Sequence, residues 1–285
     1  MLRAGRTQTL TVSRLSDYGL YLEDEEHNEV LLPNRYTSLT DKVGDTKEVF
    51  LYHDSEDRLV ATTETPLLHA GEAGYLKVVD KTVHGAFLDW GLVGKDLFLP
   101  NRNQQGGILA GRSCIVYLYE DSVTGRCVAT NKLKSFIDND CITVQPHEEV
   151  DVLVASESPI GFRVVVNNRH WGMIYRNQLF RPVAVGDRLR GWVSRITEDN
   201  RIDIALQRSG LAQVKDSAET LLDLLHENGG RLPLNDASDP AEVAHLTQMS
   251  KKTFKRAVGM LLKRGAIEMN DRGIEIRTSK QQKRK

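Results

Sequence analysis

The sequence predicts a mainly β protein that ends in a small α/β domain, and three observations support this fold class. Residues 10–206 contain short runs of alternating Val, Leu, Ile, Tyr and Phe, separated by turn residues at roughly ten-residue spacing. Landmark residues recur three times in one order along this stretch. After Leu211 the period changes to that of amphipathic helices followed by two short strands. The chain therefore reads as repeated β units with a different domain at the end.

Two glycines and one arginine define the repeat, which is clearest in residues 75–131. The first copy precedes the middle one by 66, 67 and 68 residues at the three landmarks, and the third follows it by 76, 75 and 75. Such near-constant offsets indicate a tandem repeat. The landmarks are Gly19, Gly44 and Arg58, then Gly85, Gly111 and Arg126, then Gly161, Gly186 and Arg201.

Each copy holds about five short strands, which suits a five-stranded OB-fold barrel. We expect three tandem barrels at residues 1–66, 68–137 and 145–210, the third of them divergent. A β-sandwich, or three unrelated β domains, is the alternative. Because the strand 2–3 face of an OB-fold is a common platform for oligonucleotides, the architecture also raises a functional hypothesis.

The corner around the first glycine carries a family resemblance. Tyr18-Gly19-Leu20-Tyr21 and His84-Gly85-Ala86-Phe87, followed by a Val-Gly-Asp turn and a closing strand that begins after Arg, resemble the RNA-binding domain first named in ribosomal protein S-one. The resemblance implies OB barrels whose nucleic-acid face has an aromatic residue on each side of the glycine, a histidine after the third strand and a basic residue nearby. The third copy has Ile160 and Arg163 at the corner instead, and Pro33, Pro100 and Tyr175 stand at the histidine position.

The first two copies share the loop Pro-Asn-Arg after their third strand, at residues 33–35 and 100–102. The asparagine and arginine can bind phosphate or a base edge, or they can serve the turn and cover a strand edge. Together with the corner residues they form a secondary set of candidate RNA-binding residues. This set is Tyr18, Tyr21, Arg35, His84, Phe87 and Arg102.

The third copy contains the best nucleic-acid candidate of the barrels. Residues 164–172 read as a hairpin in which Asn167-Asn168 takes the positive φ angles of a tight turn. Aromatic rings stack on unpaired bases and arginines follow the backbone. The alternative is that these rings belong to the core, with Trp171 as a half-buried anchor of the hairpin. The candidates are Phe162, Arg163, Arg169, His170, Trp171, Tyr175 and Arg176.

Three helix signals follow Leu211. Asp216 and Glu219 form a capping box before a run of leucines that Gly229-Gly230 ends. Asp239 followed by Pro240 predicts a second start, and Ser250 a third. Residues 264–269 and 274–277 then make a hairpin, so the order predicts a winged-helix domain at residues 213–278 with a disordered basic tail at 279–285.

The third helix is strongly basic. No acidic residue lies between Ser250 and Gly265. Net charge rises along the chain from −6 in residues 1–68 (7 basic and 13 acidic) to +4 in residues 211–285 (14 and 10), which places the positive field at the C-terminal end. Surface lysines can also serve solvation alone. The candidate phosphate-binding residues here are Lys251, Lys252, Lys255, Arg256 and Lys263.

The whole chain resembles the conserved virulence factor B family of bacterial RNA-binding proteins. The resemblance rests on the barrel order, on residues 161–175 of the third barrel and on the motif at residues 249–259. It implies a cytoplasmic protein that binds RNA, acts in post-transcriptional control of gene expression and has no catalytic residues.

Several classes are disfavoured by what the sequence lacks. No run approaches the ~18 apolar residues of a membrane span, and residues 1–10 lack the apolar core of a signal peptide. Cys114, Cys127 and Cys141 form no C-x-x-C pair, so we expect buried free thiols. No Gly-Lys-Ser/Thr phosphate loop and no histidines at metal-ligand spacing occur. We therefore expect that the protein is not an enzyme and that it binds no metal ion or cofactor.

The leading hypothesis is a non-catalytic binder of single-stranded RNA, with little sequence specificity, that uses the third barrel and the winged helix. The alternatives are a transcription regulator that binds DNA through the winged helix, and a protein-interaction scaffold, since fold alone does not fix function.

Overall fold

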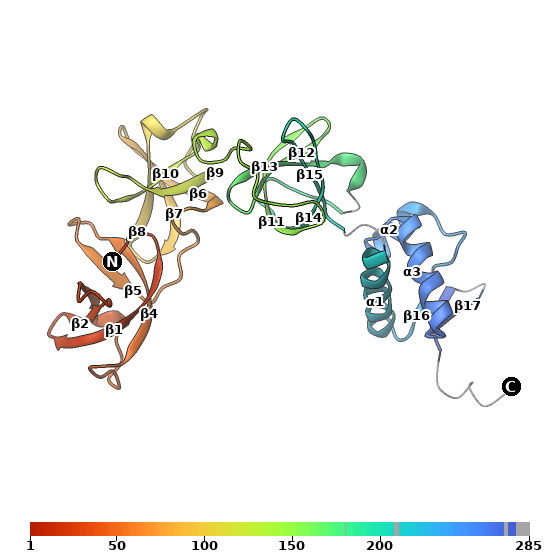
Figure 1. Ribbon diagram of the computed structural model, residues 1–285, viewed down its shortest axis with the longest axis horizontal. Helices are drawn as coiled ribbons and strands as arrows, with labels where there is room; N and C mark the ends of the chain where they lie inside the picture. The colour runs from red at the N-terminus through yellow and green to blue at the C-terminus, as the bar shows by residue number, and fades with distance from the viewer. Residues whose placement is uncertain (180, 208–210, 271–272, 278–285) are drawn as a thin grey trace. The chain divides into compact units, whose positions relative to one another are not determined.

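The computed structural model describes residues 1–179, 181–207, 211–270 and 273–277 (Figure 1). The chain divides into two compact units. Residues 1–139 with 165–170 form one unit, and residues 140–164 with 171–285 form the other. The predicted fold class is confirmed, because the described residues form five-stranded barrels and a C-terminal winged-helix domain.

The first barrel closes in the ladder order β1-β2-β3-β5-β4. Within β2, Leu20 and Leu22 are buried while Tyr21 between them is partly exposed, so strand alternation fills the barrel and sets its outer face. Its strands are β1 (Thr7–Ser16), β2 (Gly19–Glu23), β3 (Glu29–Pro33), β4 (Thr46–His53) and β5 (Leu59–Thr62).

The second barrel is nearly closed, with the ladder order β10-β9-β6-β7-β8 and its end strands β8 and β10 side by side. Its core continues into the first barrel. The ring of Phe50 meets that of Trp90 edge-on at 5.5 Å between centroids, and the indole of Trp90 donates to the carbonyl of Leu68 at 2.8 Å. Its strands are β6 (Ala73–Lys81), β7 (Gly85–Leu92), β8 (Lys95–Pro100), β9 (Ser113–Glu120) and β10 (Cys127–Thr130).

The third barrel closes in the same order as the first, β11-β12-β13-β15-β14. The turn of its β12–β13 hairpin has φ angles of 48° at Asn167 and 57° at Asn168, which confirms the predicted tight turn. Its strands are β11 (Glu149–Ser158), β12 (Gly161–Val166), β13 (His170–Tyr175), β14 (Arg188–Ile196) and β15 (Ile202–Ala205).

The repeated corner glycine has a steric cause. A Cβ atom built on Gly19, Gly85 or Gly161 would lie 2.0, 2.5 or 2.0 Å from a carbonyl oxygen of the third strand of its barrel. No side chain fits so close to a backbone oxygen, so only glycine can stand where the chain turns from the first strand into the second, against the third. The three oxygens belong to Leu32, Leu99 and Ile174.

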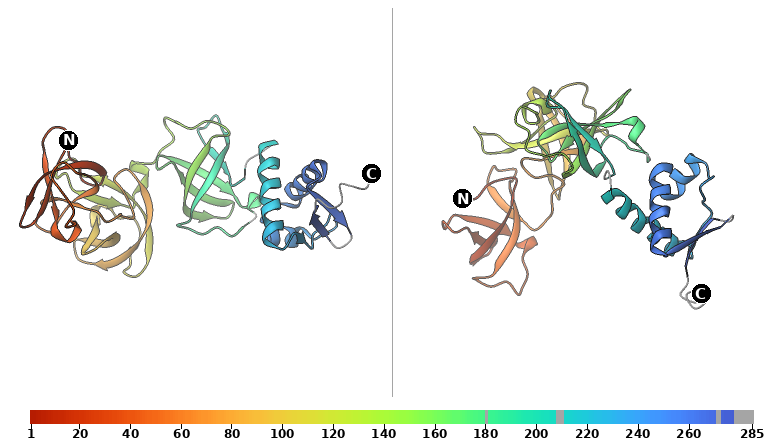
Figure 2. Two further views of the ribbon diagram at one scale, coloured as in Figure 1. Left: turned by 90° about the horizontal axis from the view of Figure 1, so that it is seen from below. Right: turned by 45° about the vertical axis from the view of Figure 1, so that its right-hand side comes forward.

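The winged-helix domain contains three helices packed on a three-stranded sheet of order β16-β18-β17 (Figure 2). Asp239 caps α2 by accepting from the backbone N–H of Ala241 at 2.7 Å, and Ser250 caps α3 by accepting from that of Thr253 at 3.1 Å, as predicted. The elements are α1 (Leu211–Glu227), β16 (Arg231–Leu232), α2 (Pro240–Thr247), α3 (Lys251–Arg264), β17 (Ile267–Asn270) and β18 (Gly273–Ile276).

Three expectations need correction. The first helix begins at Leu211, so the predicted start at Asp216 lies inside the helix. Strand β16 was not predicted, because two residues carry no period. Cys141 is exposed and Cys114 and Cys127 are only partly buried, although all three are free thiols. The basic tail and the turn at residues 271–272 lie outside the described residues.

Candidate nucleic-acid interface

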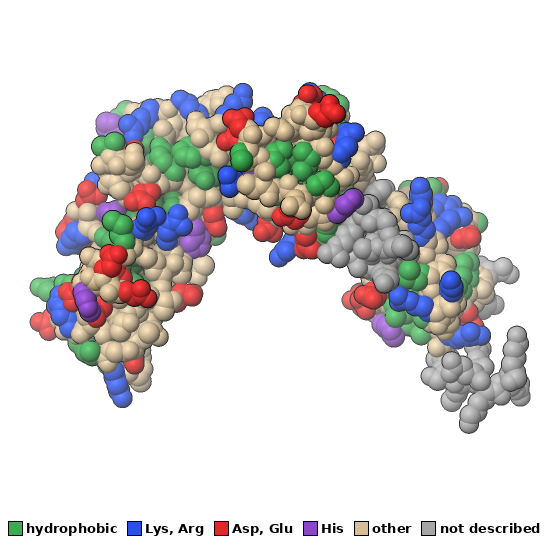
Figure 3. All heavy atoms as spheres, viewed as in Figure 1, with side chains coloured by type: hydrophobic (Ala, Val, Ile, Leu, Met, Phe, Trp, Pro, Cys, Tyr) green, Lys and Arg blue, Asp and Glu red, His purple; other side chains and the backbone are tan. Residues whose placement is uncertain are grey.

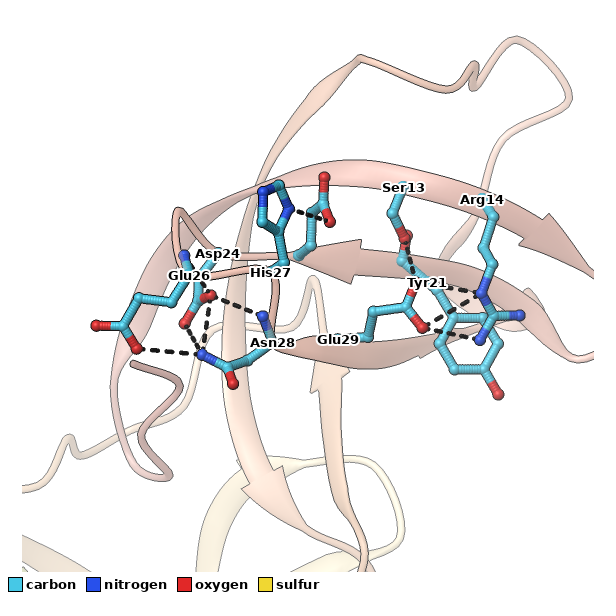
Figure 4. A network of polar contacts seen from close by, with 9 residues as sticks. Ser13, Arg14, Tyr21, Asp24, Glu26, His27, Asn28 and Glu29 are labelled. Atoms are coloured by element: carbon cyan, nitrogen blue, oxygen red, sulfur yellow. Dashed lines mark hydrogen bonds and ion pairs between the residues drawn. The ribbon is translucent and has the colours of Figure 1, made fainter.

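In the first barrel the corner tyrosines differ in what covers them. Tyr18 is 75% exposed, whereas the ring of Tyr21 lies under the guanidinium of Arg14 at 3.5 Å from the centroid (Figure 4). Arg14 also donates to Glu29 at 2.9 and 3.1 Å, and this bond lowers the pKa of the Glu29 carboxyl. One face of Tyr21 is thus already stacked on a cation of the protein itself.

An acidic turn lies beside this network in the first barrel. The side chain of Asp24 accepts from Asn28 at 3.0 and 3.1 Å (Figure 4). It also pairs with the terminal amine of Met1 at 2.8 Å. These partners hold the pKa of Asp24 well below its usual range. The turn is therefore negatively charged at neutral pH, which disfavours a polyanion at this rim.

In the second barrel the candidate rings line a cavity rather than an open sheet. Phe87 lies 5.2 Å from Phe98 between ring centroids, and both rings, with His84, border a cavity of about 470 Å³. The β4–β5 turn of the first barrel, from His53 to Asp57, forms its other wall. Burial lowers the pKa of Lys95 in this cavity. An extended nucleic-acid strand therefore cannot cross this face, because the β4–β5 turn of the first barrel closes one side of it.

The loop residues after the third strands serve mainly the fold. The side-chain amide of Asn34 donates to the carbonyl of Asp17 at 2.6 Å, and that of Asn101 to the carbonyl of Val83 at 2.7 Å. Each of these two loops forms a 3-10 turn. Residues 176–178 form the corresponding 3-10 turn in the third barrel. Arg35 lies over the ring of Tyr36, and Arg102 donates to Asp121 at 3.1 Å.

The outer face of β13 in the third barrel carries the strongest candidate. The guanidinium of Arg163 lies 3.7 Å from the ring centroid of Trp171, and burial lowers the pKa of Arg163. Because side chains two residues apart share a face of a strand, Trp171, Met173 and Tyr175 all point outward. All three are partly exposed. We call Arg163, Trp171, Met173 and Tyr175 the β13 face.

A polar network fixes the far end of the β13 face. The hydroxyl of Tyr175 donates to the buried carboxylate of Asp203 at 3.1 Å, and Arg195 donates to the other oxygen at 2.9 and 3.1 Å. Burial and the neighbouring Asp203 raise the pKa of Tyr175. Arg195 and Asp203 were not predicted from the sequence, although an aspartate between Ile202 and Ile204 in a buried strand signals a bound carboxylate.

Two of the predicted stacking residues lie inside the protein. Phe162 is 4% exposed in the barrel core, with Arg176 at 5.6 Å from its ring centroid. His170 is 1% exposed, and its Nδ1 lies 2.9 Å from the carbonyl oxygen of Asp138. Neither ring is free to stack on a base. Arg169 is exposed beside the hairpin turn, and exposed Arg176 donates to Glu157 at 2.7 Å.

The basic residues of α3 lie mostly on its exposed face. Lys252, Arg256 and Lys263 are exposed, as is Lys255, whose ammonium lies 3.9 Å from Asp236. Lys251 is half-buried instead and donates to the carbonyl of Ser238 at 2.7 Å. Figure 3 shows Lys and Arg side chains on the surface of the winged-helix domain. Four of the five predicted cations of α3 thus face solvent, and Arg264 at the end of the helix is exposed as well.

Metal-holding clusters and membrane-spanning helices are absent from the described part of the chain. Its His, Cys, Asp and Glu side chains form no group of three or more that could hold a metal ion. None of its helices is long and apolar enough to cross a membrane.

Comparison with known proteins matches both kinds of domain. The S1 domain family matches residues 4–64 and 70–132, and the CvfB-like winged helix domain family matches residues 219–276. These are families of nucleic-acid-binding domains and not of enzymes. The matches cover the first two barrels and the helical domain.

Two curated relatives align with this chain over most of their length. Protein YitL of Bacillus subtilis, described as uncharacterized, is 27% identical over 276 residues, which are 93% of this chain and 91% of that protein. Conserved virulence factor B of Staphylococcus epidermidis is 23% identical over 242 residues, 82% of this chain and 81% of the relative. A crystal structure of a multidomain protein with nucleic acid binding domains from Streptococcus pneumoniae aligns with a TM-score of 0.40 at 20% identity, covering 96% and 98% of the two chains.

Proposed function

The chain belongs to the conserved virulence factor B family, whose S1 and winged-helix domains make it a nucleic-acid-binding protein, and we propose that its ligand is single-stranded RNA. The protein acts without catalysis, in the cytoplasm, in post-transcriptional regulation of bacterial gene expression. The β13 face and α3 are its primary contacts. The residues of the first two barrels are secondary.

The observation that carries this proposal is the stacked pair on the β13 face. Arg163 lies 3.7 Å from the centroid of the Trp171 ring and leaves the ring partly exposed. An indole already paired with a cation offers a base both a stacking surface and a positive charge for its phosphate. Bases of a duplex are stacked on each other and cannot reach such a platform. Unpaired nucleotides are the ligand that fits.

The exposed cations of α3 supply the sequence-independent part of the affinity. Lysine and arginine side chains that neutralise phosphates release counterions, so binding weakens as salt rises. On a single strand, each phosphate that the protein neutralises adds about 0.7 to the steepness of log affinity against log salt. Lys255→Ala should therefore weaken binding and make the salt dependence shallower.

The test is binding of a fluorescein-labelled, unstructured 20-nucleotide RNA, followed by anisotropy. Trp171→Ala should weaken binding roughly 5- to 100-fold, because one base loses its stacking partner. Trp171→Phe should keep most of the affinity. Tyr75→Ala is the matched control, since Tyr75 is a 43% exposed aromatic on the second barrel. Equal affinity of the wild type and Trp171→Ala would remove the basis of the proposal.

A second candidate function rests on α3 itself. The exposed cations of the third helix of a winged helix also suit the groove of duplex DNA. The two functions separate by competition at equal nucleotide concentration. RNA should remain bound when duplex DNA is added. Displacement of the RNA by the duplex would favour the DNA-binding function.

A further inference from the structure

Gly259 lies in the interior of α3, which runs from Lys251 to Arg264. Glycine destabilises a helix interior relative to alanine, because it loses the most backbone freedom on folding. A glycine there calls for a compensating cause, such as a close neighbour or a positive φ angle.

Neither cause is present at Gly259 within the described structure. Apart from its chain neighbours and the backbone of its own helix, a Cβ atom built on it meets no atom within 4 Å, and its φ angle lies outside the left-handed region. Among the described glycines whose Cβ position is open, most have a positive φ and are explained by a turn. Gly107 shares both properties with Gly259 but lies in a loop. Gly259 therefore has a cost in the free protein that nothing in the described fold offsets.

The position of Gly259 on the helix is the second observation. Residues three, four and seven apart share a face of an α-helix. Lys252, Lys255, Arg256 and Lys263 stand 7, 4 and 3 residues before Gly259 and 4 after it, and all four are exposed. The bare backbone of Gly259 is thus the centre of the cationic face.

The opposite side of α3 is fully used by the fold. Phe254, Ala257, Val258 and Leu261 are buried in the core of the winged-helix domain. The helix is therefore fixed on its domain with the Gly259 face outward. No rotation of α3 is needed to present that face.

We propose that Gly259 is the point at which the sugar-phosphate backbone of RNA lies directly against α3. This inference rests on the proposed function and adds a contact to it. A Cβ atom would hold the strand away by about one C–C bond, 1.5 Å. Charge-assisted hydrogen bonds need about 2.7–2.9 Å between heavy atoms, so this displacement would break contacts with the flanking lysines and arginine.

Charge selects the occupant. Between Ser250 and Gly265 the chain has no acidic residue, and the exposed face around Gly259 carries four cations. A protein partner would need a matching acidic surface without counter-charges, whereas a nucleic-acid backbone carries one negative charge per nucleotide. The phosphate spacing of a strand meets several of these cations at once.

The test is Gly259→Ala in the full chain, with two readouts. Urea unfolding followed by circular dichroism at 222 nm reports on the α-helices, which in the described residues belong to the winged-helix domain. The unfolding midpoint should rise, because alanine is the better helix residue. Affinity for the unstructured 20-nucleotide RNA should fall roughly fivefold or more, and Gly259→Leu should weaken it further.

Lys255→Ala, on the same face, separates the possible outcomes. If Lys255→Ala weakens binding and Gly259→Ala does not, the close contact is wrong while RNA binding by α3 stands. If neither change affects binding, both the contact and the role of α3 fall. A more stable Gly259→Ala protein that binds RNA as tightly as the wild type, or more tightly, overturns the inference.

Discussion

Among single residues, the corner glycines show how one missing atom sets a repeated fold. Gly19 and Gly44 both have positive φ angles, 145° and 93°, but only Gly19 has a backbone oxygen 2.0 Å from its Cβ position. Gly44 has open space around it. Comparing substitutions at the two sites therefore distinguishes the cost of the steric collision from the cost of the backbone strain.

Gly19→Ala should destabilise the first barrel by about 3 kcal/mol or more, and Gly44→Ala by about 1–2 kcal/mol. Urea unfolding of a chain with Trp171 and Trp192 replaced by Phe, followed through Trp90 fluorescence, measures both. Equal effects of the two substitutions would show that the collision with Leu32 is relieved at little cost.

Cys127 gives a pH-dependent prediction. Burial raises the pKa of its thiol to about 12, above the ~8.5 of an unfolded chain. As pH rises past about 8.5, the unfolded chain loses this proton first, so the free energy of unfolding should fall between about pH 8.5 and 12. Cys127→Ala should lose that part of the alkaline dependence.

The same burial protects Cys127 from alkylation, because the thiolate is the reactive form. Iodoacetamide at pH 8 should modify exposed Cys141 at least about tenfold faster than Cys127. Mass spectrometry of the labelled peptides measures the ratio. Equal rates would show that the partly buried thiol of Cys127 is as accessible as that of Cys141.

Sequence patterns located the corner glycines correctly but did not predict which aromatic side chains are exposed. Gly19, Gly85 and Gly161 were found from their offsets alone, because sterics leaves glycine no substitute there. Phe162 and His170 were assigned to a binding surface, but both are buried. The sequence of a barrel strand does not show which of its aromatic side chains point inward until the register of the strand is known.

Among the helices and strands, local chemistry predicted the ends of helices where a cap is present. Asp239 and Ser250 cap α2 and α3 as expected. The start of α1 was placed too late, since a capping-box pattern also occurs by chance within a helix. The network of Tyr175, Asp203 and Arg195 could not be predicted, because it joins three strands that only the closed barrel brings together.

Ser250→Ala should destabilise the winged-helix domain by about 1 kcal/mol, because the N–H of Thr253 loses its acceptor. Ser250→Asp should restore the cap. Urea unfolding followed at 222 nm measures both variants. An unchanged midpoint for Ser250→Ala would mean that the helix end finds another partner at no cost.

Across the whole molecule, charge and packing are distributed unevenly along the chain. The first two barrels share one core through Phe50 and Trp90, and the first carries the acidic charge. Net positive charge collects in residues 211–285. The described chain therefore combines a two-barrel unit joined by a core with a C-terminal domain whose helix α3 carries exposed cations.

The shared core predicts that the first two barrels unfold together. Phe50→Ala should cost about 3–5 kcal/mol, because it removes a buried ring that both barrels contact. Hydrogen exchange should quicken by a similar factor in β1–β2 and in β9–β10, while β11–β14 of the third barrel stays protected. Faster exchange confined to β1–β2 would show that the two barrels are independent.

The β13 face and α3 should both contact RNA in the complex. Photocrosslinking of the full chain to an unstructured RNA containing 4-thiouridine, followed by mass spectrometry of the linked peptides, locates the bound strand. We predict crosslinks at Trp171 and Tyr175 and within residues 251–264. Crosslinks confined to residues 1–139 would contradict this placement and move the RNA site to the first two barrels.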